Sequence, residues 1–378
     1  MFRFLRNLFV IFFIVITAFP VPAQNPVIEP FILPSARFSA LGGRHTAMAD
    51  DFYSIFLNPS AFYGIREEFS AGEFTISSYG PVMELLEPVF SGGDFNLARL
   101  AGPGGFAIGF DIGGPLSFGW VGRGLGIGVF SRIKVTASAS SVRVRPLAFG
   151  DLVISGGYAL RLLDRTGHSL DAGFSGKGFF RGLIDFPESN IVEVDELLEN
   201  PMDQPFISYL GVGLDLGLRY ILNNNLTVAL VMYDVYSPVF IAPYETTADF
   251  FNRESSTGPS SFSTVQRRLD LGVSYRVRSV LMDRYITRFM VMADYRDILD
   301  LFSEIPRNPI LNLGLGLEVT ILNALAFRAG INDALPALGF GLDLSFAKFE
   351  FAIYGRELGI DPGIQPVLAM DLSVSFRY

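Results

Sequence analysis

The stretch SARFSALGGRHTAMADDFYSIFLNPSAF, residues Ser35–Phe62, fits neither a regular strand nor a long helix. It contains the glycine pair Gly42-Gly43, the adjacent acids Asp50-Asp51 and the helix-stopping dipeptide Asn58-Pro59. Glycine and other small residues let a backbone turn tightly and pack close to another backbone. The stretch therefore predicts an irregular segment that packs closely against surrounding structure.

The rest of the chain is built from short stretches in which apolar residues alternate with small or polar ones. The clearest is Leu210–Tyr220, where leucines and Val212 occupy one face and glycines, Asp215 and Arg219 the other. A tilted membrane strand needs about 9–11 residues, which suits this stretch. After residue 23 we find no run of 18 apolar residues, so the hydrophobicity is spread over many strands. The pattern predicts an all-β fold, an antiparallel transmembrane β-barrel of about 14 strands.

Both ends of the chain carry export features. Met1–Ala23 has arginines at its start, a short apolar run over Leu8–Phe19 and small residues before Gln24, as expected of a cleaved signal peptide. The last strand, Leu368–Tyr378, alternates up to a terminal aromatic residue, which resembles the signal by which bacterial outer-membrane barrels are recognised for assembly. These features predict export to the bacterial outer membrane.

Composition argues against several other classes of protein. The net charge is −9, whereas phosphate binding needs a cationic face, so we expect no nucleic-acid partner. The absence of cysteine excludes disulfides and thiolate metal sites. The two histidines, His45 and His168, belong to no Ser-His-Asp or metal-binding pattern. We therefore expect no enzyme activity, no metal and no cofactor.

The opening stretch resembles the N-terminal plug of the FadL-type family of outer-membrane transporters, which includes a PorV-like branch. The resemblance is carried by the order and spacing of Leu41-Gly42-Gly43, Ala47, Ala49-Asp50-Asp51 and Asn58-Pro59. Ser60 and Ala61 replace the usual small pair, and His45 and Phe52 depart from the common pattern. The alternative is a glycine-rich loop that leads into an ordinary β domain.

This resemblance implies a division of the chain. Residues 1–23 would be the signal peptide, residues 24–65 a plug inside the lumen, and residues 66–378 the barrel. The plug residues that it singles out are Gly42, Gly43, Asp50, Asp51, Asn58 and Pro59.

Charged residues alternate with the apolar faces of the strands, so we expect them to point into the lumen. Charges inside a protein need partners. One interpretation is a network of ion pairs that holds the plug and stiffens the wall. The other is that arginines bind the carboxylate of a passing substrate through bidentate hydrogen bonds. The candidates for that role are Arg219, Arg276 and Arg328.

Gly113–Gly124 interrupts two strand-like stretches with glycines and Pro115, which marks a bulge or kink. In the FadL-type family the ligand leaves sideways through a gap beside a kinked strand. The resemblance therefore makes Gly113, Gly114 and Pro115 candidates for a lateral opening.

The resemblance implies a channel for passive uptake of hydrophobic compounds such as long-chain fatty acids. Its partners would be outer-membrane lipid, hydrophobic small molecules and the barrel assembly machinery. An alternative from another class is a barrel that serves as a partner or shuttle in protein secretion. A structural or adhesive surface protein is a third possibility.

Overall fold

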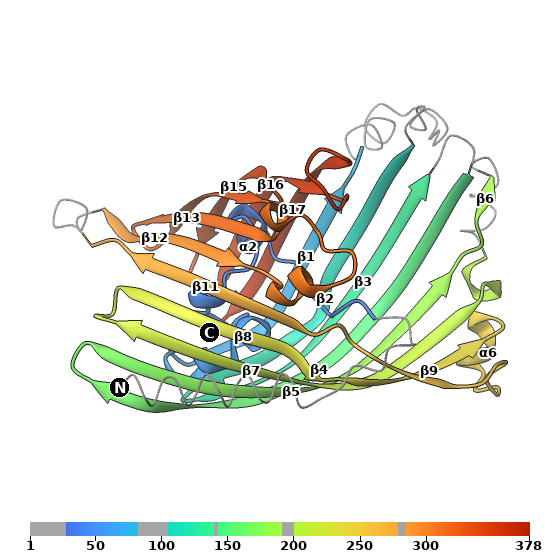
Figure 1. Cartoon of the computed structure of the whole chain (residues 1–378), viewed down its shortest axis with the longest axis horizontal. Helices are drawn as coiled ribbons and strands as arrows, with labels where there is room; N and C mark the ends of the chain where they lie inside the picture. The colour runs from blue at the N-terminus through green and yellow to red at the C-terminus, as the bar shows by residue number, and fades with distance from the viewer. Residues whose placement is uncertain (1–27, 82–104, 140–142, 191–199, 279–284) are drawn as a thin grey trace.

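The computed structural model describes residues 28–81, 105–139, 143–190, 200–278 and 285–378, which form one β-barrel (Figure 1). The predicted signal peptide lies outside these residues. The strands, in chain order, are β1 (Glu68–Tyr79), β2 (Phe106–Gly122), β3 (Leu125–Ala139), β4 (Arg143–Arg165), β5 (His168–Asp185), β6 (Ser189–Asn190), β7 (Phe206–Leu222), β8 (Leu226–Tyr236), β9 (Pro238–Tyr244), β10 (Ser261–Thr264), β11 (Arg268–Arg276), β12 (Ile286–Tyr295), β13 (Leu313–Ile321), β14 (Leu325–Asn332), β15 (Leu335–Asp343), β16 (Ala347–Glu357) and β17 (Pro366–Arg377).

The barrel closes where the last strand pairs with the first. β17 runs antiparallel to β1, from Ser70 opposite Arg377 to Tyr79 opposite Ala369. β8 and β9 follow each other along β7 and form one interrupted wall strand, and β10 and β11 do the same beside them. β6 is a two-residue piece on β4. The described residues therefore form a closed antiparallel barrel of 14 wall strands, which confirms the predicted fold.

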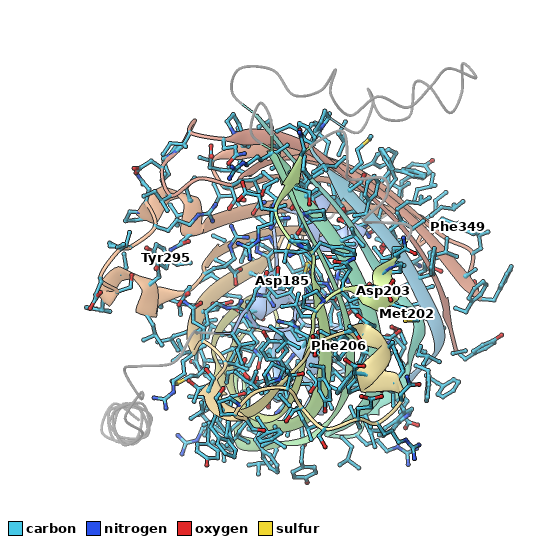
Figure 2. The ribbon with its side chains drawn as sticks, turned by 90° about the vertical axis from the view of Figure 1, so that its right-hand side faces the viewer. Asp185, Met202, Asp203, Phe206, Tyr295 and Phe349 are labelled. Atoms are coloured by element: carbon cyan, nitrogen blue, oxygen red, sulfur yellow. The ribbon has the colours of Figure 1, made fainter. Side chains whose placement is uncertain are left out.

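Alternation separates the two faces of the wall. On β7, Leu210 and Val212 are 60% and 55% exposed, whereas Asp215 and Arg219 are 3% and 7% exposed. Phe349 likewise points away from the barrel in the end view of Figure 2. A wall that is apolar outside and polar inside is the pattern of a barrel that spans a bilayer.

The two ends of the barrel differ. Tight turns at residues 123–124, 166–167, 223–225 and 322–324 join strands at one end, here called the turn end. The opposite, loop end carries the longer connections, together with the two-residue turn 333–334 between β14 and β15. The strands are also unequal, since β4 and β5 have 23 and 18 residues but β13 and β14 have nine and eight. The wall is therefore taller along β2–β7 (Figure 1).

Short helices occupy the lumen and the loop end. Four lie before β1, namely α2 (Ala36–Ala40), η1 (Thr46–Met48), α3 (Ser54–Leu57) and η2 (Pro59–Tyr63). The others are η4 (Pro201–Asp203), α6 (Thr247–Phe251), η5 (Ile298–Phe302) and η6 (Pro309–Asn312). Met202 and Phe206 are seen beside α6 at the loop end (Figure 2). None of the helices in the described part of the chain is long and apolar enough to cross a bilayer.

The bulge or kink predicted at Gly113–Gly124 is confirmed as a bulge. β2 continues through residues 113–122 without leaving the wall, and its register against β3 shifts between Gly113 and Ser117. Residues 236–266 are polar and serine-rich, which is typical of an external loop, but they contribute β9 and β10 to the wall. Ser237-Pro238 interrupts the alternation there and conceals the continuing strand.

Candidate functional site

Residues 28–65, the lumenal segment, lie inside the barrel (Figure 1). Leu41, Phe52 and Phe62 are completely buried and belong to one hydrophobic cluster with Phe130 of the inner wall. The ring centroid of Phe130 lies 5.3 Å from that of Phe52 and 4.3 Å from that of Phe56. A segment with little regular structure thus obtains its core from the wall that surrounds it.

One pair of facing glycines on the wall makes room for the first turn of the lumenal segment. Gly316 and Gly330 are cross-strand partners, and both lie against Leu41. Gly42 has a φ of +81°, and a Cβ there would lie 2.4 Å from the carbonyl oxygens of Leu315 and Ile331. Backbone therefore packs on backbone, as only glycine permits.

A second glycine pair receives the end of the segment. Gly173 and Gly217 are cross-strand partners, and both lie against Pro59 and Ser60. The Asn58 side chain accepts hydrogen bonds from Ser60 N (3.0 Å) and donates one to Thr46 O (3.1 Å). Asn58-Pro59 therefore fixes the chain where it leaves the lumen.

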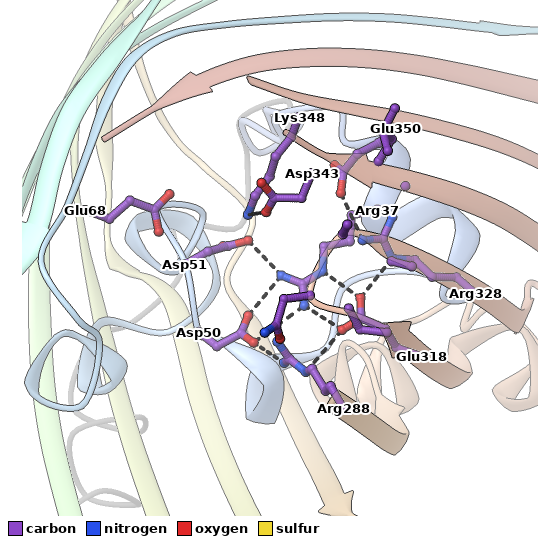
Figure 3. Close-up of a pocket in the computed structure, with 16 residues that line it drawn as sticks. Arg37, Asp50, Asp51, Glu68, Arg288, Glu318, Arg328, Asp343, Lys348 and Glu350 are labelled. Carbon is purple, nitrogen blue, oxygen red and sulfur yellow. Dashed lines mark hydrogen bonds and ion pairs between the residues drawn. The ribbon is translucent and has the colours of Figure 1, made fainter. Parts of the chain in front are cut away.

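A buried ion-pair network joins the segment to the wall at the turn end (Figure 3). Arg37 donates to both carboxylate oxygens of Glu318 at 3.0 Å, and also to Asp50 (3.0 Å) and Asp51 (2.7 Å). Arg328 Nε donates to Glu318 at 2.8 Å, and Arg288 pairs with Asp50. Arg37 therefore links two acids of the segment to β13, and Glu318 links it to β12 and β14.

The charges in this network hold one another ionised. Burial disfavours ionised Asp50, but Arg288 and Arg37 outweigh it and lower the pKa of Asp50 to about 2. Burial likewise opposes the charge of Arg37, but Asp50, Glu318 and Asp51 together raise the pKa of Arg37 well above its usual value. The ion-pair attachment of the lumenal segment to the wall is therefore insensitive to pH across the neutral range.

A second polar anchor lies on β12. His45 Nδ1 lies 2.8 Å from Asp294 Oδ1, and its Nε2 lies 2.7 Å from Leu41 O. The backbone and hydroxyl of Thr46 both donate to Asp294 Oδ2, at 2.8 and 2.7 Å. The His45 ring is therefore held between a side chain of β12 and a carbonyl of its own segment.

The three arginines predicted to bind substrate lie apart. Arg219 donates to Asp171 (2.9 Å) and to Ala49 O of the lumenal segment (3.5 Å). Arg328 is held between Glu318 and Glu350. Arg276 is exposed at the turn end of β11. The structure does not bring the three into one site. The contact of Arg219 with Ala49 O matches the interpretation that such charges hold the segment, and Arg328 joins β14 to β13 and β16 within the wall. Their role toward substrate stays a prediction.

Two cavities lie on opposite sides of the lumenal segment. The turn-end cavity has a volume of about 340 Å³ and is lined by the Arg37 network (Figure 3). The loop-end cavity has a volume of about 510 Å³ and combines charged residues with apolar ones such as Ile32, Leu33 and Leu311. The segment thus separates two chambers of the lumen.

Arg44 distinguishes the loop-end cavity. Its guanidinium lies 5.7 Å from the ring centroid of Tyr233, and Arg268 lies 4.5 Å from the same ring. Within the described ranges Arg44 makes no ion pair with an acid. Burial and the charges of Arg268 and Arg296 lower the pKa of Arg44 to about 10, so it remains a cation at neutral pH. Strand alternation does not point to Arg44, because Arg44 lies in the lumenal segment and not on a strand. In the sequence its mark is a cation directly after Gly42-Gly43.

The predicted lateral opening lies where β2 bulges. The register of β2 shifts against β1 between Gly113 and Gly119, and against β3 between Gly113 and Ser117. Gly114 has a φ of +91°, and a Cβ on Gly113 would lie 3.0 Å from Pro34 of the lumenal segment. The bulge is thus covered from inside, and its opening stays a prediction.

These features define a class of protein, a membrane-spanning β-barrel of the bacterial outer-membrane type whose lumen is occupied by its own N-terminal segment. By sequence, the chain matches no known family and no curated protein. By structure, it is similar to FadL-type hydrocarbon transporters.

Three solved structures illustrate that similarity. The Pseudomonas putida toluene transporter TodX is 12% identical, with a TM-score of 0.46 over 93% of this chain and 99% of TodX. The CymD monoaromatic hydrocarbon channel is 13% identical, with a TM-score of 0.48 over 93% and 98% of the two chains. A Pseudomonas aeruginosa FadL homologue is 10% identical, with a TM-score of 0.47 over 93% and 99%.

Proposed function

We propose that this protein is an outer-membrane channel for passive uptake of hydrophobic compounds, with the lumenal segment as its plug. The observation that carries the proposal is the pair of chambers separated by a segment fastened through ion pairs and hydrogen bonds. Such a segment can shift as a unit without opening the hydrogen-bonded wall. Bacterial outer-membrane barrels have short turns on the periplasmic side and longer loops outside, so we place the turn end in the periplasm and the loop end at the cell exterior.

Arg44 suggests the finer class of substrate, an amphipathic molecule with an anionic headgroup, such as a long-chain fatty acid. The mixed lining of the loop-end cavity supplies apolar surface for a chain and a cation for a carboxylate. Charge-assisted hydrogen bonds from a guanidinium suit that headgroup. In this proposal the ligand rests above the plug before it moves on, and Gly113–Pro115 is one candidate exit.

Substitution of Arg44 tests the substrate class. Losing a hydrogen bond to a charged group costs about 1.5–3 kcal/mol, so Arg44→Gln should weaken palmitate binding roughly 10- to 150-fold. Hexadecanol, which has the chain but not the charge, should bind both proteins equally. Arg123→Gln in an exposed turn is the matched control. Equal loss of palmitate and hexadecanol binding would contradict a headgroup role for Arg44.

A second candidate, a partner in protein secretion, is favoured by apolar side chains on the outer loops. Phe302 and Ile305 are 82% and 75% exposed. Their loop is tied to the β16–β17 loop, since Asn308 N donates to Ile360 O at 2.8 Å. The double variant Phe302→Asp, Ile305→Asp distinguishes an uptake channel from a secretion partner. A channel should keep palmitate uptake in this variant, whereas a secretion partner should lose export of envelope proteins.

A further inference from the structure

Most of the cations in the loop-end cavity already have acidic partners. Seven cationic side chains line it, and five of them form ion pairs, namely Arg132, Lys134, Arg268, Arg296 and Arg307. In the part of the chain that the structure describes, the other two, Arg44 and Arg356, form none. Arg44 is the headgroup site of the proposed function. Arg356, on β16, is therefore a second cation in the same cavity that has no acid to balance it.

The acids closest to Arg356 along β16 and β17 are satisfied by other donors. The carboxylate of Glu357 accepts hydrogen bonds from three backbone N–H groups of the loop that follows it, at 2.7–2.9 Å. Asp371 accepts hydrogen bonds from three hydroxyl groups, those of Ser39, Ser77 and Tyr354. Neither carboxylate is spent on the guanidinium of Arg356, whose N–H groups stay available to a ligand.

Each of the two arginines lies over a tyrosine ring that the fold holds in place. The guanidinium of Arg356 lies 5.0 Å from the ring centroid of Tyr79, much as Arg44 lies 5.7 Å from that of Tyr233. The Tyr79 ring fills a gap over Gly109, where a Cβ would lie 2.2 Å from the ring. The Tyr233 hydroxyl donates to a carbonyl of the lumenal segment at 2.6 Å. Because a ring face attracts a cation without occupying its N–H groups, both arginines are positioned and both can still donate.

The two tyrosines stand on opposite parts of the wall. Tyr79 is the last residue of β1, and Tyr233 belongs to β8. With each divided strand counted once, five wall strands lie between β1 and β8 in one direction and seven in the other. The cavity reaches both arginines, and its lining includes the apolar side chains of Ile32, Leu33, Leu311 and Leu358. It thus combines two separate cations with apolar surface.

We propose that the loop-end cavity takes a long-chain α,ω-dicarboxylate, with one carboxylate at Arg44 and the other at Arg356. The proposal rests on the proposed function, because it adds a second contact to the same cavity and the same class of amphipathic cargo. A guanidinium can donate two parallel hydrogen bonds to a carboxylate. A ligand held at both ends makes a contact that a monocarboxylate lacks, so Arg356 determines specificity for the far end of the chain.

Substitution of Arg356 tests the second contact with two ligands of equal chain length. Hexadecanedioate has the chain of palmitate and a carboxylate at each end. Both are titrated against the full chain in phosphatidylethanolamine–phosphatidylglycerol nanodiscs. A hydrogen bond to a charged group is worth roughly 10-fold or more in affinity. Arg356→Gln should therefore weaken hexadecanedioate binding by at least about 10-fold and leave palmitate binding unchanged, whereas Arg44→Gln should weaken both.

Two controls separate this contact from a structural effect. Arg356→Lys keeps the charge and should lose much less hexadecanedioate affinity than Arg356→Gln. Unchanged heat-modifiable mobility in gels shows that the variants fold. Equal loss of both ligands in Arg356→Gln, or loss of neither, would overturn the two-ended site. If the proposed function itself is wrong, the wild type binds neither ligand, whereas failure of the two-ended site alone leaves palmitate binding and its dependence on Arg44 intact.

Discussion

Arg37 and Arg44, seven residues apart in the same segment, have opposite surroundings. Arg37 contacts three carboxylates, whereas Arg44 lies near two other guanidiniums and the ring of Tyr233. Alternation along the strands predicts which wall charges point inward, but it does not predict what they meet. That depends on how the lumenal segment is threaded, which is a long-range property. The sequence therefore predicted a lumenal charge network but not which of its residues pair with one another.

Removing Arg37 should loosen the lumenal segment and leave the wall intact. Breaking a buried ion pair from one side costs about 3–5 kcal/mol, because Glu318, Asp50 and Asp51 keep their charges. We expect Arg37→Met to raise single-channel conductance in planar bilayers. Adding Glu318→Gln to Arg37→Met removes one of the charges left without Arg37, and it should bring the conductance part of the way back to the wild-type value. Arg123→Ala, at an exposed ion pair, should change nothing. Wild-type conductance in Arg37→Met would show that this network does not hold the segment.

Asp297 should make anion binding in the loop-end cavity depend on pH. Burial raises the pKa of Asp297 to about 6, Arg268 opposes this shift, and Asp270 and Asp300 add to it. The carboxylate is therefore negative at pH 7.5 and mostly neutral at pH 5. Removing one negative charge near Arg268 should strengthen binding of an alkyl sulfonate, which stays ionised, by roughly 1 kcal/mol, or about fivefold. Calorimetry at both pH values measures it.

The control for this prediction is Asp297→Asn. It should bind the sulfonate at pH 7.5 as tightly as the wild type does at pH 5, with little change between the two. A wild-type affinity that falls on acidification would have the wrong sign for this mechanism.

At the scale of the element, strands were the predictable part. A period-two pattern is local, so Leu210–Tyr220 lies within the observed β7, and the predicted last strand ends one residue beyond β17. β9 and β10 were missed because Ser237-Pro238 breaks the pattern. The glycine pairs were also out of reach, because Gly173 and Gly217 become partners only through the register of β5 with β7. The sequence shows glycines on one face of β7, but not which of them receive the lumenal segment.

The two faces of β15 allow a test of the bilayer position. β15 has nine residues, so Leu338 lies near its middle and is exposed on the outer face. Arginine at the bilayer midplane costs about 2–4 kcal/mol, and near the interface about 0–1 kcal/mol. Leu338→Arg should therefore destabilise the barrel far more than Phe346→Arg in the turn before β16. Unfolding in urea from vesicles measures both, and equal losses would be inconsistent with the assigned membrane position.

At the scale of the whole molecule, the wall and the lumenal segment are separable. The ladders that close the barrel run from strand to strand, and the segment joins them at few points, such as Ile28 with Val265. Residues 35–60 also lie wholly before β1. The wall should therefore fold without them.

Deleting residues 35–60 should leave a folded barrel with an open lumen. We expect heat-modifiable mobility in gels to persist, because the wall keeps its hydrogen bonds. Single-channel conductance should rise strongly, and saturable palmitate uptake should be lost. Unchanged conductance would show that this segment does not block the lumen. Loss of heat-modifiable mobility would show that the wall depends on it.

Because the strands differ in length, the barrel wall has a tall side and a low side. About 9–11 residues cross a bilayer, so the surplus residues of β4, β5 and β7 stand beyond the membrane surface as a screen on one side of the mouth. On the opposite side the strands have little surplus, and the rim lies close to the lipid headgroups. If the barrel is the channel proposed above, a molecule that diffuses along the membrane surface would reach the mouth over the low rim and would be blocked on the opposite side by the tall strands. Uptake would then depend on the direction of approach, and in a crowded membrane on which protein lies next to the low side.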